Sequence, residues 1–188
     1  MRNYLILFTA TIIAIVAFSC EKDIDEQDYP DLINPFDSIN SYFIQAERIA
    51  GAGCSLYLIS GVQDNALASL NYDLNWKYYF INGKRIITFE IIKGKTKVSD
   101  KIMQELPMGH EFVYKNDDRL KSVLSTKILW DECINKYKKP ILNIDIYVPL
   151  IFPKSNFICS LYSKEGFSQL GVDYFIFDAN TGNDLTIE

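Results

Sequence analysis

The residue types that most often carry enzyme chemistry are scarce in this chain. His110 is the single histidine, and no serine, cysteine or carboxylate stands at a spacing that marks it as the partner of a general base. The sequence also lacks a Cys-x-x-Cys pair, a metal-binding histidine pair and a glycine-rich phosphate loop. We therefore expect no catalytic residue, no metal ligand and no cofactor, and we interpret His110 as a loop residue without a catalytic role.

The four cysteines allow a different chemistry, which is modification of a thiol. Cys20 follows an apolar stretch, whereas Cys54, Cys133 and Cys159 are spread through the rest of the chain. Three remaining thiols can form at most one disulfide, and Cys133 with Cys159 is the more plausible pair because both fall in the same predicted unit. We favour three buried free thiols that pack as small apolar side chains.

The first twenty residues have the pattern of an export signal. Arg2 precedes an apolar run at residues 4–18 that contains no charged residue, and acidic residues follow directly after Cys20. A positive segment followed by an apolar segment is typical of a secretory signal. The run is shorter than the roughly 20 residues that a transmembrane helix needs. An uncleaved membrane anchor and a conventional signal peptide stay as alternatives.

The residues Ala17-Phe18-Ser19-Cys20 resemble the lipobox of bacterial lipoproteins, in which the chain is cleaved before a cysteine whose thiol is then acylated. This resemblance implies cleavage between Ser19 and Cys20, lipidation of Cys20 and attachment to a membrane outside the cytoplasm. The charged segment after Cys20 resembles the start of surface-exposed lipoproteins of the Bacteroidetes. That second resemblance implies the cell envelope, on the periplasmic or the surface face of the outer membrane.

Composition and charge predict a globular domain with an acidic excess. The chain has 188 residues, of which 48% are hydrophobic and 14% aromatic, and its formal net charge is −5. This hydrophobic content excludes general disorder. The negative net charge argues against binding to nucleic acid and against adsorption to anionic lipid. We therefore expect membrane attachment through acylated Cys20 rather than through the protein surface.

The pattern of apolar and turn residues divides the chain into five parts. Residues 1–19 form the expected signal peptide, and residues 20–35 form an acidic flexible tether. Two units are expected at 36–96 and 119–188, with a connector at 97–118. Each unit is predicted to pack one helix on a curled antiparallel sheet of about four strands, which gives an α+β fold class with two tandem units.

The expected elements of the first unit are one helix and four strands. Apolar residues recur at helical spacing over residues 39–50. Asn82-Gly83 predicts a hairpin, because both residues accept a positive φ. The expected strands of this unit are residues 55–60, 68–74, 76–81 and 85–92.

The second unit allows two helix positions. A helix could cover residues 120–137, or a shorter one could cover 131–138 with Asp131 as its N-cap. Three strands are expected after it, at residues 141–151, 156–162 and 173–178.

The two units also repeat one another in order. Residues 87–94 align with residues 175–182 at a constant offset of 88. The stretch from Tyr174 through Asp178-Ala-Asn-Thr-Gly182 resembles the final strand of PepSY-type domains, which pair one helix with a curled sheet as cystatins do. The resemblance implies a PepSY-like or cystatin-like fold in each unit, an association with protease propeptides, inhibition or extracytoplasmic binding, and no catalytic residues.

The expected function is therefore binding without catalysis. We expect a lipid-anchored extracytoplasmic module that recognises or inhibits a protein or peptide, with unpaired strand edges as the contact. Trp76, Tyr78 and Tyr79 are candidates for partner-facing aromatic residues. One alternative is a small-ligand-binding or enzyme-like α+β barrel with a pocket between helix and sheet, and another is a structural subunit of a surface assembly.

Overall fold

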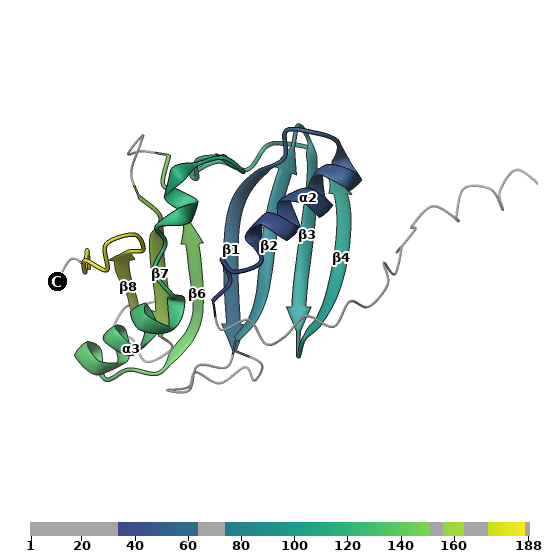
Figure 1. The fold of residues 1–188 in the computed structure, drawn as a ribbon. Helices are drawn as coiled ribbons and strands as arrows, with labels where there is room; N and C mark the ends of the chain where they lie inside the picture. The colour runs from purple at the N-terminus through teal and green to yellow at the C-terminus, as the bar shows by residue number, and fades with distance from the viewer. Residues whose placement is uncertain (1–33, 64–73, 151–155, 164–172, 187–188) are drawn as a thin grey trace, which may run out of the picture.

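One antiparallel sheet runs through the protein from end to end (Figure 1). The computed structural model describes residues 34–63, 74–150, 156–163 and 173–186. The strand order is β4-β3-β2-β1-β6-β7-β8, and β5 pairs with one end of β1. The expected signal peptide and almost all of the expected tether lie outside the described residues.

The strands and helices have the following bounds. The strands are β1 (Ser55–Gln63), β2 (Leu74–Asn82), β3 (Arg85–Ile92), β4 (Lys95–Ile102), β5 (Val113–Tyr114), β6 (Ile141–Tyr147), β7 (Ile158–Ser163) and β8 (Asp173–Asp178). The helices are α2 (Ile39–Ala50), α3 (Thr126–Tyr137) and the short 3₁₀ helix η1 (Asp118–Lys121). Strand β4 and strand β5 lie largely in the range that the sequence assigned to a connector.

The prediction of two tandem helix-on-sheet units is wrong, because the halves share one sheet. Strands β1 and β6 pair at its centre, from Ile59 opposite Ile146 to Val62 opposite Asn143. The buried apolar residues of both halves form a single core cluster. The physical reason is that two separate sheets would each leave a row of backbone amides and carbonyls unpaired at an edge, and the β1–β6 pairing satisfies both rows.

The first helix forms over the predicted residues. Four of its side chains are buried, at helical spacing: Ile39, Tyr42, Phe43 and Ala46. The ring centroids of Tyr42 and Tyr78 lie 4.6 Å apart, and those of Phe43 and Phe80 lie 4.9 Å apart. The helix therefore packs its apolar face on strand β2, as an amphipathic helix must in order to bury that face.

The second helix matches neither predicted position. Helix α3 follows Ser125 and begins at Thr126, whose side chain is buried together with those of Leu129, Trp130 and Cys133. Asp131 is an exposed mid-helix residue that accepts a hydrogen bond from Lys127, one turn earlier. A charged residue in this place suggested an N-cap, but it marks only the solvent side of the helix.

Both helices pack on the same face of the sheet (Figure 1). The core side chains Tyr78, Phe89 and Phe177 alternate along their strands with side chains that point to the opposite face. Within the described ranges, no helix covers that opposite face. We call it the helix-free face.

Candidate functional site

The three aromatic residues predicted to face a partner point in two directions. Trp76 and Tyr78 belong to the core, with exposed fractions of 3% and 0%. The hydroxyl of Tyr78 donates a hydrogen bond to the backbone carbonyl of Pro35, at 2.9 Å. Tyr79 lies between the buried residues Tyr78 and Phe80 on strand β2, so its half-buried side chain is on the helix-free face. Of the three residues, Tyr79 is the one that a partner could reach.

The helix-free face carries a row of polar residues at its centre. Cross-strand pairing aligns Ser160, Asp145, Ser60 and Lys77 on four neighbouring strands, β7, β6, β1 and β2. Lys77 forms an ion pair of 2.6 Å with Glu90 on the next strand, β3. The sequence did not predict this row, because its residues lie far apart in the chain and meet only through non-local strand pairing.

Asp145 is the buried acidic group of this row. The hydroxyl of Ser60 donates a hydrogen bond to Oδ1 of Asp145 at 2.7 Å, and the hydroxyl of Tyr162 is a second partner of the carboxylate. Burial raises the pKa of Asp145, and the hydrogen bonds from the two hydroxyls offset part of the rise. Burial and the neighbouring Asp145 raise the pKa of Tyr162 to about 12. Tyr162 therefore stays protonated and donates to the carboxylate.

His110 lies beside this network, near the point on strand β1 where the neighbouring strand changes from β5 to β6. Residues 109–112 run alongside the chain that continues beyond strand β6. The amide of Glu111 donates a hydrogen bond to the carbonyl of Val148 at 2.7 Å, and the amide of Leu150 donates one to the carbonyl of Gly109 at 3.0 Å. This arrangement inserts the His110 ring between two tyrosines.

The His110 ring is held by aromatic contacts on both sides. Its centroid lies 4.1 Å from that of Tyr147, in a stacked arrangement, and 4.8 Å from that of Tyr57. Burial lowers the pKa of His110, and the charge of Asp145 offsets part of that decrease. The ring is therefore neutral at pH 7, and Nδ1 is a buried atom without a hydrogen-bond partner among the described residues.

The chemistry available in this cluster is hydrogen bonding and aromatic contact. The Ser60 hydroxyl is already used as a donor to Asp145, and the Tyr147 hydroxyl lies 3.2 Å from Oγ of Ser160. In the part of the chain that the structure describes, no group of three or more His, Cys, Asp or Glu residues could hold a metal ion. We define the aromatic cluster as Tyr57, His110 and Tyr147, whose rings are in contact, together with Tyr162, the hydrogen-bond partner of Asp145.

The three cysteines of the folded part are buried and free. This confirms the favoured interpretation of Cys54, Cys133 and Cys159 as small apolar core residues, and no Cys133–Cys159 disulfide forms. Burial raises the pKa of Cys133 to about 12 and also raises that of Cys159. Because the thiolate is the reactive form, these thiols are protected in the folded protein.

The stretch that resembles a PepSY strand end forms a tight turn. The carboxylate of Asp178 accepts hydrogen bonds from the backbone amides of Asn180 and Thr181, each at 2.9 Å. It also accepts one from Nδ2 of Asn156 at 2.8 Å. Gly182 follows with a φ of 79°, a left-handed conformation that glycine adopts without strain. The residues of this motif therefore have a structural role here.

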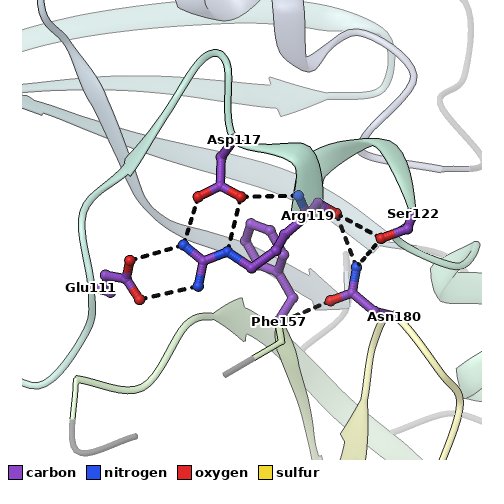
Figure 2. Close-up of polar contacts among 6 residues, drawn as sticks. All are labelled: Glu111, Asp117, Arg119, Ser122, Phe157 and Asn180. Carbon is purple, nitrogen blue, oxygen red and sulfur yellow. Dashed lines mark hydrogen bonds and ion pairs between the residues drawn. The ribbon is translucent and has the colours of Figure 1, made fainter. Parts of the chain in front are cut away.

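Asn180 connects this turn to two other segments (Figure 2). Its Nδ2 donates to the carbonyl of Arg119 at 2.9 Å and to Oγ of Ser122 at 2.8 Å. Its Oδ1 accepts a hydrogen bond from the amide of Phe157 at 2.8 Å. One side chain thus satisfies polar groups on the η1 segment and at the start of strand β7.

Arg119 lies between two carboxylates in the same cluster (Figure 2). Its Nη2 is 2.6 Å from Oδ2 of Asp117 and 2.8 Å from Oε1 of Glu111. The hydrogen bonds to the two carboxylates raise the pKa of Arg119, and the one to Asp117 has the larger effect. In turn, the hydrogen bonds from Arg119 lower the pKa of Asp117. We call Glu111, Asp117, Arg119 and Asn180 the polar joint, because it fastens the segment before α3 to the C-terminal turn.

The two edges of the sheet differ from the expected free strand edges. Beyond β8, the amide of Leu185 donates to the carbonyl of Ile176 at 2.7 Å, so the C-terminal segment covers that edge. Strand β4 carries Lys95, Lys97 and Lys101 at alternate positions. Edge lysines oppose pairing with a further strand. The helix-free face is therefore a better candidate for recognition than either edge.

Comparison with known proteins gives a likeness of fold. No protein-family model matches the chain, and no curated protein matches it. A crystal structure from Clostridium difficile 630, described as that of a "putative lipoprotein", is similar with a TM-score of 0.57. The two chains are 8% identical, and the match covers 88% of this chain and 99% of the other. At this identity the likeness shows a shared fold alone. No helix within the described ranges is long and apolar enough to cross a membrane.

Proposed function

We propose that this protein is a lipid-anchored binding protein of the cell envelope that acts outside the cytoplasm and catalyses no reaction. It recognises a protein or peptide through the helix-free face of its sheet. The observation that carries this proposal is the aromatic cluster on that face, where the rings of Tyr57 and Tyr147 contact His110 and Tyr162 is a hydrogen-bond partner of Asp145. Tyrosines combine a large apolar ring with a polar end, and they are enriched in binding interfaces.

The anchor is acylated Cys20, and the membrane is the outer membrane. Support comes from the signal-like run before Cys20, from the acidic segment after it, and from a neighbour of the same fold that is described as a lipoprotein. Metabolic labelling with a fatty acid tests the anchor. The wild-type chain and a Cys54→Ala control should take up label and sediment with membranes, whereas Cys20→Ala should do neither. Label retained by Cys20→Ala would contradict the proposal.

Site-specific photo-crosslinking tests the recognition surface. A photoreactive phenylalanine at Tyr79 or Tyr174, on the helix-free face, should give the same adduct in intact cells. The control position is Ile128, which is 54% exposed on helix α3 on the other side of the sheet. An adduct at Ile128 alone, or none at either tyrosine, would show that the helix-free face is not the recognition surface.

A further inference from the structure

Asp145 is a half-buried carboxylate that no lysine or arginine neutralises among the described residues. Its hydrogen-bond partners are two hydroxyl groups. Other partly buried carboxylates of the protein are paired with cations: Oδ2 of Asp117 lies 2.6 Å from Nη2 of Arg119, and Oδ2 of Asp184 lies 2.5 Å from Nζ of Lys136. Asp145 therefore brings to the helix-free face a negative charge that the described chain does not pair.

Two basic side chains lie on or beside the same polar row, and neither neutralises Asp145. Lys77 is two strands away and forms an ion pair with Glu90 on its far side. His110 is neutral at pH 7, because burial lowers its pKa. A cation that approached from solution would therefore meet at Asp145 a carboxylate whose charge is still available.

Aromatic side chains accompany this carboxylate on the same face. Tyr147 follows Asp145 by two positions on strand β6, so both side chains point to the helix-free side. The ring of Tyr147 stacks on His110, which also contacts Tyr57, and Tyr162 reaches Asp145 from strand β7. A guanidinium group suits this combination, because its plane stacks on an aromatic ring while its N–H groups bind a carboxylate.

We propose that Asp145 and the aromatic cluster bind an arginine side chain of the protein or peptide partner. This inference rests on the proposed function, and it states the chemistry of the partner. Arginine is favoured over lysine because a guanidinium is planar and more weakly hydrated than an ammonium group, so it loses less hydration at a half-buried site. The whole-chain net charge of −5 favours the approach of a basic partner.

The two hydroxyl donors orient the carboxylate for such a ligand. Ser60 donates a hydrogen bond to Oδ1 of Asp145 at 2.7 Å, and Tyr162 is the second donor. An ionised carboxylate accepts about four hydrogen bonds, so about two positions are left for the two parallel N–H groups of a guanidinium. Because these donors fix the orientation of Asp145 before binding, less conformational entropy is lost when the partner arrives.

The imidazole signals of His110 in a proton NMR spectrum report binding at this site. His110 is the single histidine, so an untagged chain from Glu21, which contains all the described helices and strands, gives one set of such signals. The probe is N-acetyl-arginine methylamide at up to about 20 mM. The control probe is N-acetyl-citrulline methylamide, which has nearly the same shape without the charge, at equal ionic strength. We expect the arginine probe to shift the signals saturably, by at least about fivefold more than the citrulline probe.

Two variants identify the carboxylate responsible. Asp145→Asn keeps the shape of the side chain and removes its charge, and it should lose the preference for the arginine probe. The matched control, Asp131→Asn, removes the same charge from an exposed position of helix α3, on the other face of the sheet, and should retain the preference. Asp145→Ser takes the place of Asp145→Asn if that variant fails to unfold cooperatively.

Three results would overturn the proposal. The first is an equal shift of the His110 signals with the arginine and citrulline probes. The second is a response of Asp145→Asn that equals that of the wild type or of a similarly weakened Asp131→Asn. The third is an equal or larger shift with N-acetyl-lysine methylamide, which would show a general cation site. None of these results bears on the acylation of Cys20 or on crosslinking at Tyr79, so a failure here leaves the proposed function standing.

Discussion

Asp145 illustrates at the scale of single residues how a buried polar group on the helix-free face reduces stability. A carboxylate that loses water on folding destabilises the folded state, even where Ser60 and Tyr162 donate hydrogen bonds to it. The group lies on the helix-free face, where an apolar residue would avoid this cost. Such a costly group is typical of a functional surface.

Replacement of Asp145 by asparagine should make stability less dependent on pH. Because the folded-state pKa of Asp145 is raised, its favourable contribution is complete below the unfolded-state pKa of about 4 and is lost as the pH rises through the folded-state value. The stability of Asp145→Asn relative to wild type should therefore increase from pH 3.5 to pH 7, by roughly 1.4 kcal/mol per unit of pKa shift. Denaturant unfolding at the two pH values measures it.

The control for this experiment is Asn183→Ala, because Asn183 is exposed and its side chain does not ionise. Its stability difference from wild type should stay nearly constant over the same range. A constant difference for Asp145→Asn as well would contradict the assignment of Asp145 as a buried carboxylate with a raised pKa.

Asn180 should be the most sensitive residue of the polar joint. Asn180→Ala leaves the Phe157 amide and the Arg119 carbonyl without their partner, which should reduce the free energy of unfolding by about 2 kcal/mol. Asn180→Asp should be at least as harmful, because it removes the Nδ2 donor and adds a charge. The exposed Asn183→Ala is the control and should change stability by less than about 0.5 kcal/mol. Thermal unfolding would distinguish these outcomes.

At the scale of helices and strands, the sequence predicted α2 well and α3 poorly. Helix α2 has a regular apolar stripe from Ile39 onwards, and Gly51 at its C-terminus has a φ of 93°. Helix α3 begins with Thr126, a polar residue that is buried, and contains Ile128, an apolar residue that points to solvent. Its apolar and polar residues are therefore not cleanly separated on two faces. Local periodicity cannot reveal which face of such a helix is buried, because the neighbouring strands decide it.

A hairpin forms at the predicted place, but its turn lies one residue later than predicted: strand β2 ends at Asn82, strand β3 begins at Arg85, and the turn residues are Gly83 and Lys84. Gly83 has a positive φ of 56°, whereas Asn82 belongs to the strand. A glycine in a short turn is a local signal, so the sequence could place the hairpin to within one residue. The pairing of β1 with β6 joins residues more than 80 positions apart, and no local pattern encodes it. The aromatic cluster depends on that pairing and was missed for the same reason.

Gly61 on strand β1 tests the fit between two central strands. A Cβ atom at this position would lie 2.8 Å from the ring of Trp76 on strand β2, so Gly61→Ala must displace the indole. We expect a loss of about 1–3 kcal/mol in denaturant unfolding. The same substitution in a Trp76→Leu background should cost much less, because the smaller side chain leaves room. An unchanged cost in that background would contradict the steric explanation.

At the scale of the whole molecule, the two halves have the same order of elements around β1 and β6. The four buried positions of α2 recur in α3 at a spacing of 87 residues, from Ile39 and Thr126 to Ala46 and Cys133. Despite this correspondence, the halves share one core. We therefore expect them to unfold together rather than one after the other.

Thiol reactivity measures that cooperativity. Cys54 lies in one half, and Cys133 and Cys159 lie in the other, and all three are buried. At a reagent concentration that makes modification faster than refolding, a thiol reagent added to the chain from Glu21 should modify all three at one common rate, equal to the rate of global unfolding. Modification of Cys54 well before the other two would show independent unfolding of the halves.

The covered margin beyond β8 limits what this protein could build if copies of it joined by backbone pairing. Fibre growth needs two complementary open sheet edges on every copy. In the described chain, the amide of Leu185 already donates a hydrogen bond to the carbonyl of Ile176 at one of the two edges. Two copies could meet only through their β4 strands, and such a pair would be closed, with no side left for a third copy. Even a variant that lost its lysines would therefore stop at a dimer and could not grow into a filament.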